Sequence, residues 1–163
     1  MSDVITGIIP SAPRRVFGVG VLYALGGLLI YLAVTQPPSA AYALFLVAVG
    51  AISIYGGWRM WQVTGRRIEL TEDELRLSDG TLICKTADLH RVDRSFFAFK
   101  PSNGFLITTK VSYPTAWAPG LWWRFGKRIG VGGVTPGADG KVMADTLSAF
   151  IAARDGLLDD LKL

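Results

Sequence analysis

The sequence has one cysteine, Cys84, and one histidine, His90, among its 163 residues. A disulfide within the chain is therefore excluded, as is a metal site built from several Cys or His ligands. Charged residues are scarce at 18%, whereas 50% of the residues are hydrophobic and the mean hydropathy is +0.36. Disordered chains have the opposite composition, so we expect most of this chain to be folded. We expect Cys84 to be a small core residue and His90 to lie at the surface of a strand.

Charge is absent altogether from one long tract. Between Arg15 and Arg59 lie 43 consecutive residues without Asp, Glu, Lys, Arg or His. About 20 helical residues cross a bilayer core, so this tract is twice too long for one span. The two prolines at 37–38 cannot continue a helix. The sequence therefore predicts a transmembrane helical hairpin with spans at 16–35 and 40–61.

Two other interpretations of this tract remain open. One is a helical hairpin buried in a soluble protein, although such helices normally show a polar stripe that is missing here. The other is a cleaved export signal, because Arg14 and Arg15 precede the apolar run and small residues stand at Ala41 and Ala43. Against cleavage, the run is longer than the core of a signal peptide, and a second span follows at once.

Arginines flank the tract on its two outer sides, and the central turn has no charge. They are Arg14 and Arg15 before the first span and Arg59, Arg66 and Arg67 after the second. Because positive charge is enriched on the cytoplasmic side of membrane helices, we expect both chain ends in the cytoplasm. Aromatic residues agree with this orientation: Phe17, Tyr55, Trp58 and Trp61 fall near the inner interface, and Tyr31 and Tyr42 near the outer one.

Small residues at a spacing of four mark candidate helix-packing positions. They are Gly20 and Ala24 in the first span and Ser53 and Gly57 in the second. In lipid, small side chains let helix backbones approach closely. These positions could pack the two spans against each other or receive another membrane protein. Neither span contains an ionisable group, so the sequence predicts no proton relay, ion site or transport path.

Residues 66–155 change to short alternating segments separated by turn signals, which predicts a small antiparallel sheet or barrel. The expected strands are 66–70, 74–77, 81–84, 89–97, 104–110 and 127–134. A helix is expected at 140–154, with Val142, Leu147, Phe150 and Ile151 on its apolar face and a stop at Asp155-Gly156. Residues 1–15 would then be a cytoplasmic N-terminal segment and 156–163 a tail. The class is α+β and dominated by strands.

Two stretches of this region carry a family resemblance. They are IELTEDELRLSDG at 68–80 and LHRVD at 89–93. Strands in this order, placed after membrane helices, resemble bacterial pleckstrin-homology-like (PH-like) domain membrane proteins. The resemblance implies a split, bent barrel closed by a C-terminal helix, a location in the bacterial inner (cell) membrane, and no shared catalytic residues. The segment 117–134 lies outside the pattern.

A basic and aromatic segment at 117–128 is the candidate contact surface. The candidate contact residues are Trp117, Trp122, Trp123, Arg124, Lys127 and Arg128, and Phe125 is a further aromatic residue of the segment. Trp and basic side chains together suit the headgroup layer of an anionic leaflet. Alternatively, some of these tryptophans fill the core and the arginines are ordinary surface charge. Because the segment is short and tethered to a membrane, we do not expect it to bind nucleic acid.

No set of residues indicates a catalytic, metal or cofactor site. The acidic run at 72–74 falls on a turn, where solvation explains it, and the glycines at 130–133 lack the fingerprint of a phosphate loop. We therefore predict a non-enzymatic inner-membrane protein that docks another membrane protein as an accessory or regulatory subunit. The alternative hypothesis is a tethered module that binds anionic lipid headgroups through Arg124, Lys127 and Arg128.

Overall fold

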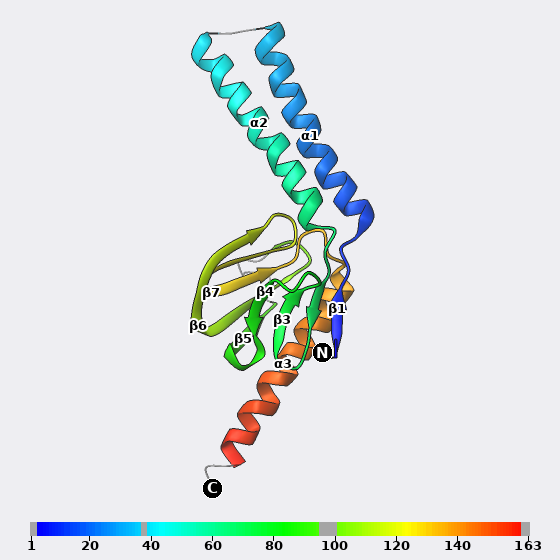
Figure 1. Ribbon diagram of the computed structural model, residues 1–163, viewed down its shortest axis with the longest axis vertical. Coiled ribbons are helices and arrows are strands. Elements are labelled where there is room, and N and C mark those ends of the chain that lie inside the picture. The colour runs from blue at the N-terminus through cyan, green and yellow to red at the C-terminus, as the bar shows by residue number, and fades with distance from the viewer. Residues whose placement is uncertain (1–2, 37–38, 95–100, 161–163) are drawn as a thin grey trace.

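A computed structural model describes residues 3–36, 39–94 and 101–160 of the chain, with side chains up to Gly156. Two long helices project together from one end of a mixed domain, and a third helix leaves the domain at the opposite end (Figure 1). The N-terminal strand lies beside this third helix, within the domain. The chain therefore begins in the domain, leaves it as a helical hairpin and returns.

The helical hairpin consists of α1, Ala12–Thr35, and α2, Ala40–Val63. Both helices are long and apolar enough to cross a membrane, and they contain the two expected spans with a few added residues at the domain end. Only 17% and 11% of their most apolar stretches are buried inside the molecule. A core hairpin of a soluble protein would be mostly buried, so the exposure favours the membrane interpretation. The expected turn at 37–38 lies outside the described residues.

The strands form two antiparallel sheets. The first has the order β1-β2-β3-β4, with β1 at Thr6–Ile8, β2 at Ile68–Leu70, β3 at Glu74–Leu77 and β4 at Leu82–Lys85. The second has the order β5-β6-β7, with β5 at Leu89–Asp93, β6 at Phe105–Ala118 and β7 at Trp122–Val131. Within the described residues both sheets are open, so two open antiparallel sheets stand in place of the expected split barrel.

Strand β1 is the main departure from the expected domain boundaries. Residues before the first span were expected to form only a cytoplasmic segment, but Thr6, Gly7 and Ile8 pair with β2, and Ile8 is 1% exposed. The hairpin is thus inserted between two neighbouring strands. Cleavage near Ala43 would remove β1 from its sheet, which argues against the export-signal interpretation.

A long bent hairpin replaces the two separate strands expected at 104–110 and 127–134. Strands β6 and β7 pair from Phe105↔Val131 to Ala118↔Trp122, with irregular register between Thr108 and Ala116. The turn at its end contains Gly120 with a φ of +77°, a conformation that favours glycine. The unmatched segment 117–134 therefore belongs mostly to one hairpin.

Helix α3, Gly137–Asp160, is longer than expected at both ends. It passes through Asp155-Gly156, so the predicted stop and the separate tail at 156–160 are wrong. One glycine costs a helix only about 1 kcal/mol, which the neighbouring turns can offset. Its buried face contains Met143, Ala144 and Leu147, whereas Val142 is 56% exposed.

The hydrophobic core lies between the two sheets and α3. It contains residues from β1 to β7 and the fully buried Phe105 and Leu121. Cys84 is also buried, as expected. Because Ile8 and Val63 belong to the same cluster, residues at both ends of the helical hairpin contribute to the core of the domain.

Candidate functional site

Glycines set the packing of α1 against α2. A Cβ added to Gly26 would lie 2.6 Å from Cγ1 of Ile54 and 2.8 Å from the carbonyl oxygen of Gly50. A Cβ added to Gly50 would lie 3.0 Å from the carbonyl oxygen of Gly26. The helices therefore cross with these two glycines face to face. Neither Gly26 nor Gly50 has another small residue four positions away in its own helix. The search for pairs of small residues at that spacing therefore did not find them.

The four predicted packing residues divide between two faces. Ser53 and Gly57 are buried, and a Cβ on Gly57 would lie 3.3 Å from Cβ of Leu22, so this pair packs inside the hairpin. Gly20 and Ala24 are exposed. They lie on the side of α1 that faces away from α2, and a Cβ added to Gly20 would have no neighbour within 4 Å.

Gly27 extends this exposed stripe by one helical turn. It is also exposed, and a Cβ added there would have no neighbour within 4 Å. Positions 20, 24 and 27 follow the i, i+4, i+7 spacing of one helix face. The outer face of α1, defined as Gly20, Ala24 and Gly27, is therefore not used in the packing of the hairpin.

Two arginines attach the start of α1 to the rest of the molecule. Arg14 donates from Nη1 to the carbonyl oxygen of Thr135 at 2.8 Å. Arg15 donates to the carbonyl oxygen of Trp61, and its guanidinium lies 3.9 Å from the centre of the Trp61 ring. The sequence indicated these residues as markers of orientation or as the start of an export signal. In the structure they also brace α1 against α2 and against the domain.

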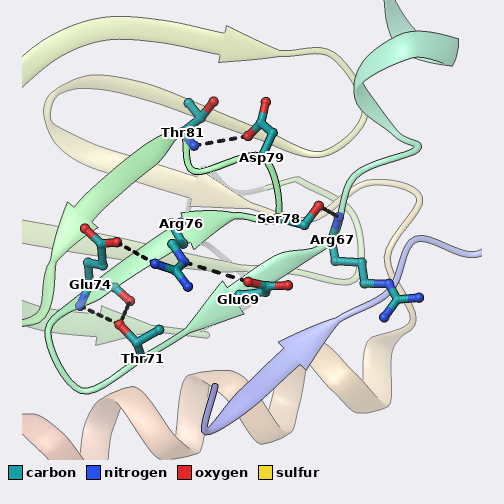
Figure 2. A network of polar contacts seen from close by, with 8 residues as sticks. All are labelled: Arg67, Glu69, Thr71, Glu74, Arg76, Ser78, Asp79 and Thr81. Atoms are coloured by element: carbon teal, nitrogen blue, oxygen red, sulfur yellow. Dashed lines mark hydrogen bonds and ion pairs between the residues drawn. The ribbon is translucent and has the colours of Figure 1, made fainter. Parts of the chain in front are cut away.

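The segment that follows α2 is held by the turn between β3 and β4. Arg66 forms an ion pair of 2.6 Å with Asp79. Figure 2 shows the next contact, in which the amide of Arg67 donates to Oγ of Ser78 at 3.2 Å. Burial acts to raise the pKa of Asp79, but hydrogen bonds from Thr81 and the charge of Arg66 outweigh it and lower the pKa. Both ends of the hairpin are therefore joined to the domain by specific contacts.

The same network continues across β2 and β3. Arg76 lies between Glu69, at 3.8 Å, and Glu74, at 3.2 Å (Figure 2). Oγ1 of Thr71 accepts from the amide of Glu74 at 3.1 Å and closes the turn between the strands. These contacts hold β2, which is continuous with the segment after α2, in its register. Glu72 and Asp73 of the acidic run lie on this turn, as the sequence indicated, and Glu74 begins β3.

The predicted basic and aromatic residues divide between the core and the surface. Trp122 is 4% exposed and Arg124 is 9% exposed, so both lie inside the domain. Trp117 is 66% exposed, Lys127 and Arg128 are exposed, and Trp123 is half-buried. Phe125, the further aromatic residue of the segment, is 55% exposed. Alternation along β7 separates Trp122 and Arg124 from Trp123 and Phe125.

Arg124 has an internal role. Its Nη1 donates to the carbonyl oxygens of Ile83 at 2.6 Å and Leu82 at 3.1 Å, and its Nε donates to that of Pro114 at 2.8 Å. The guanidinium also lies over the rings of Tyr113 and Trp122. Arg124 therefore links β4 of one sheet to β6 and β7 of the other.

Tyr113 and Cys84 lie beside this buried cation. The Tyr113 hydroxyl donates to Asp88 and accepts from the amide of Lys85 at 3.0 Å. Burial, with the hydrogen bond to Asp88, raises the pKa of Tyr113 to about 12. Burial likewise raises the pKa of the Cys84 thiol to about 12. Both groups are therefore neutral at physiological pH.

We expect the Cys84 thiol to resist alkylation in the folded protein. With a pKa raised from 9.0 to about 12, the thiolate fraction at pH 8 is about a thousandfold lower than in the unfolded chain. Between pH 9 and 12 the thiol ionises in the unfolded chain but not in the folded protein. The free energy of unfolding is therefore also expected to fall as the pH rises through this range. Iodoacetamide labelling with and without denaturant measures the first effect. Equal labelling in both states would contradict it.

The other candidate residues do not gather into a site. His90 is exposed on β5, as expected, and the glycines at 130–133 lie at the end of β7, where Gly130 is covered by the Trp123 ring. In the described part of the chain, no group of three His, Cys, Asp or Glu side chains could hold a metal ion.

Comparison with protein-family models, with curated proteins and with solved structures finds no match to this chain.

Proposed function

We propose that this chain is a two-span inner-membrane protein that docks another membrane protein, as a non-enzymatic accessory or regulatory subunit. The observation that carries the proposal is the outer face of α1. Gly20 and Gly27 have open space where a side chain would be, whereas Gly26, Gly50 and Gly57 lie close to atoms of the opposite helix. A stripe of this kind lets a second helix approach closely within lipid.

The insertion of the hairpin between β1 and β2 supports the proposed topology. Residues 6–8 and 68–70 are neighbours in one sheet. If the two helices cross the membrane, both ends of the hairpin must then lie on the same side. The arginines at this end of the hairpin favour the cytoplasmic side. The domain would thus lie directly beneath the inner leaflet.

The contacts at both hairpin ends support a regulatory role. Arg14 and Arg15 hold the start of α1, while Arg66 and Arg67 hold the segment after α2. A partner that shifts α1 relative to α2 would therefore act on β1 and β2 directly. The succession of antiparallel strands and a C-terminal helix also supports the PH-like assignment of the domain, although the sheets are open.

Co-purification of the full-length protein from membranes in mild detergent tests this proposal. We expect Gly20→Leu to reduce the recovery of a defined membrane partner about tenfold or more, because a bulky side chain separates the helices. Gly56→Leu is the matched control, since a Cβ at Gly56 also has no neighbour within 4 Å but lies on α2. Recovery of a monomer alone, or equal losses in both variants, would contradict the proposal.

A further inference from the structure

Large aromatic side chains lie exposed on one face of the β6–β7 hairpin. Trp117 is 66% exposed and Phe125 is 55% exposed. Trp117 pairs directly with Trp123, whose ring lies 5.4 Å from that of Phe125. We call these three residues the β6–β7 outer face. Such a concentration of exposed aromatic surface typically marks an interaction site.

This face begins at the end of the domain from which the helices project. A Cβ on Gly120, in the turn of the β6–β7 hairpin, would lie 2.8 Å from the Met60 methyl group of α2. The end of β6 runs toward the base of α2 (Figure 1). Trp117 is three residues from Gly120 and is therefore close to the level of Met60 and Trp61 along the helices.

The part of α2 nearest the domain carries a belt of exposed aromatic side chains. Tyr55, Trp58 and Trp61 of α2 are 60%, 46% and 45% exposed. Trp and Tyr side chains are enriched where a membrane helix passes through the headgroup layer. The β6–β7 outer face thus continues, on the domain, the belt that α2 presents. Continuity of this kind favours a lipid surface over a separate protein as the occupant.

The positive charge of the β6–β7 hairpin complements an anionic surface. Lys110, Lys127 and Arg128 are exposed, and no acidic residue occurs between Asp93 and Asp139. Arg124 does not contribute, because its donors are bonded inside the domain. Each basic side chain near an anionic leaflet raises the affinity about fivefold at physiological ionic strength.

We propose that the β6–β7 outer face rests in the headgroup layer of the leaflet from which α1 and α2 emerge, with Lys110, Lys127 and Arg128 binding its anionic lipids. The occupant is the lipid surface itself. This contact rests on the membrane insertion in the proposed function but does not require a docking partner. It keeps Phe125 as a lipid contact, adds Lys110, which the sequence did not single out, and removes Arg124 and Trp122 from the set.

A spin label on the full-length protein in lipid nanodiscs tests the contact. Thr115→Cys places the label two residues from Trp117, on the same side of β6, and leaves the outer face intact. The background substitution Cys84→Ala removes the native thiol. Ala152→Cys, exposed on α3 at the opposite end of the domain, is the control position. The readout is collision of the label with a water-soluble nickel chelate.

We expect nickel accessibility at position 115 to fall about threefold when discs of neutral phosphatidylcholine are exchanged for discs with phosphatidylglycerol, while position 152 does not change. The triple variant Lys110→Ser, Lys127→Ser, Arg128→Ser should restore the accessibility. Removal of the same charge at Lys85, Arg91 and Lys141, which are exposed elsewhere on the domain, should not.

Three results would overturn the proposal. Equal accessibility at position 115 in both lipids would show that the face remains in water. Shielding that persists in detergent micelles or in the triple variant would mean that protein, such as a second copy of the chain, covers the face. Failure of the chain to enter discs would overturn the proposed membrane function as well, whereas the first two results leave that function standing.

Discussion

A fragment comprising residues 66–163 is expected to be largely unfolded, although it contains nearly all of the domain. It lacks Ile8, which is 1% exposed, and the backbone pairing of β1 with β2. Burial of one such side chain is worth about 1.5–3 kcal/mol, and a typical domain is stable by only about 5–15 kcal/mol. Loss of β1 also uncovers the edge of β2 and the part of α3 that contacts β1.

A variant that keeps β1 but lacks the two helices provides the matched comparison. Because Ile8 pairs with Ile68, a two-residue Asn-Gly turn can join residues 3–8 to residues 68–160 and replace the helices. We expect this variant to unfold cooperatively, as followed by circular dichroism, whereas the 66–163 fragment shows no transition. Equal melting curves for the two proteins would show that β1 is dispensable and would contradict the expectation.

Arg124→Met is expected to destabilise the domain by about 3 kcal/mol or more. The substitution keeps much of the buried aliphatic volume but removes the donors to Leu82, Ile83 and Pro114. Loss of the partner of a buried carbonyl, here that of Ile83, costs about 1–3 kcal/mol, and the two part-buried hydrogen bonds to Leu82 and Pro114 add to this loss. Two of these carbonyls belong to β4, so we expect the contact between the two sheets to weaken first.

Urea denaturation of the variant without helices, or of the full-length protein, measures this loss of stability. Arg128→Met is the matched control, because Arg128 is exposed four residues along the same strand and should change stability by less than about 0.5 kcal/mol. If the two variants had the same midpoint, Arg124 would not be the link between the sheets that its hydrogen bonds indicate.

The candidate site was only partly predictable from the residues. The basic and aromatic composition of 117–128 indicated a contact surface, but composition does not say which side chains point inward. The bent hairpin places Arg124 and Trp122 inside and Trp117 and Phe125 outside. Likewise, equal spacing of small residues did not distinguish Gly20, on the outer face of α1, from Gly57, inside the hairpin.

The sequence by itself determined the two apolar helices, because 43 uncharged residues interrupted by two prolines allow few other local structures. It also determined most strands of the first sheet, whose alternation and turn residues act over short distances. Only the tertiary structure decided that β1 pairs with β2 across the 59 residues between Ile8 and Ile68, since such pairing depends on a shared core and not on local pattern. The same holds for the two open sheets, which Arg124 joins through carbonyls that no sequence motif marks.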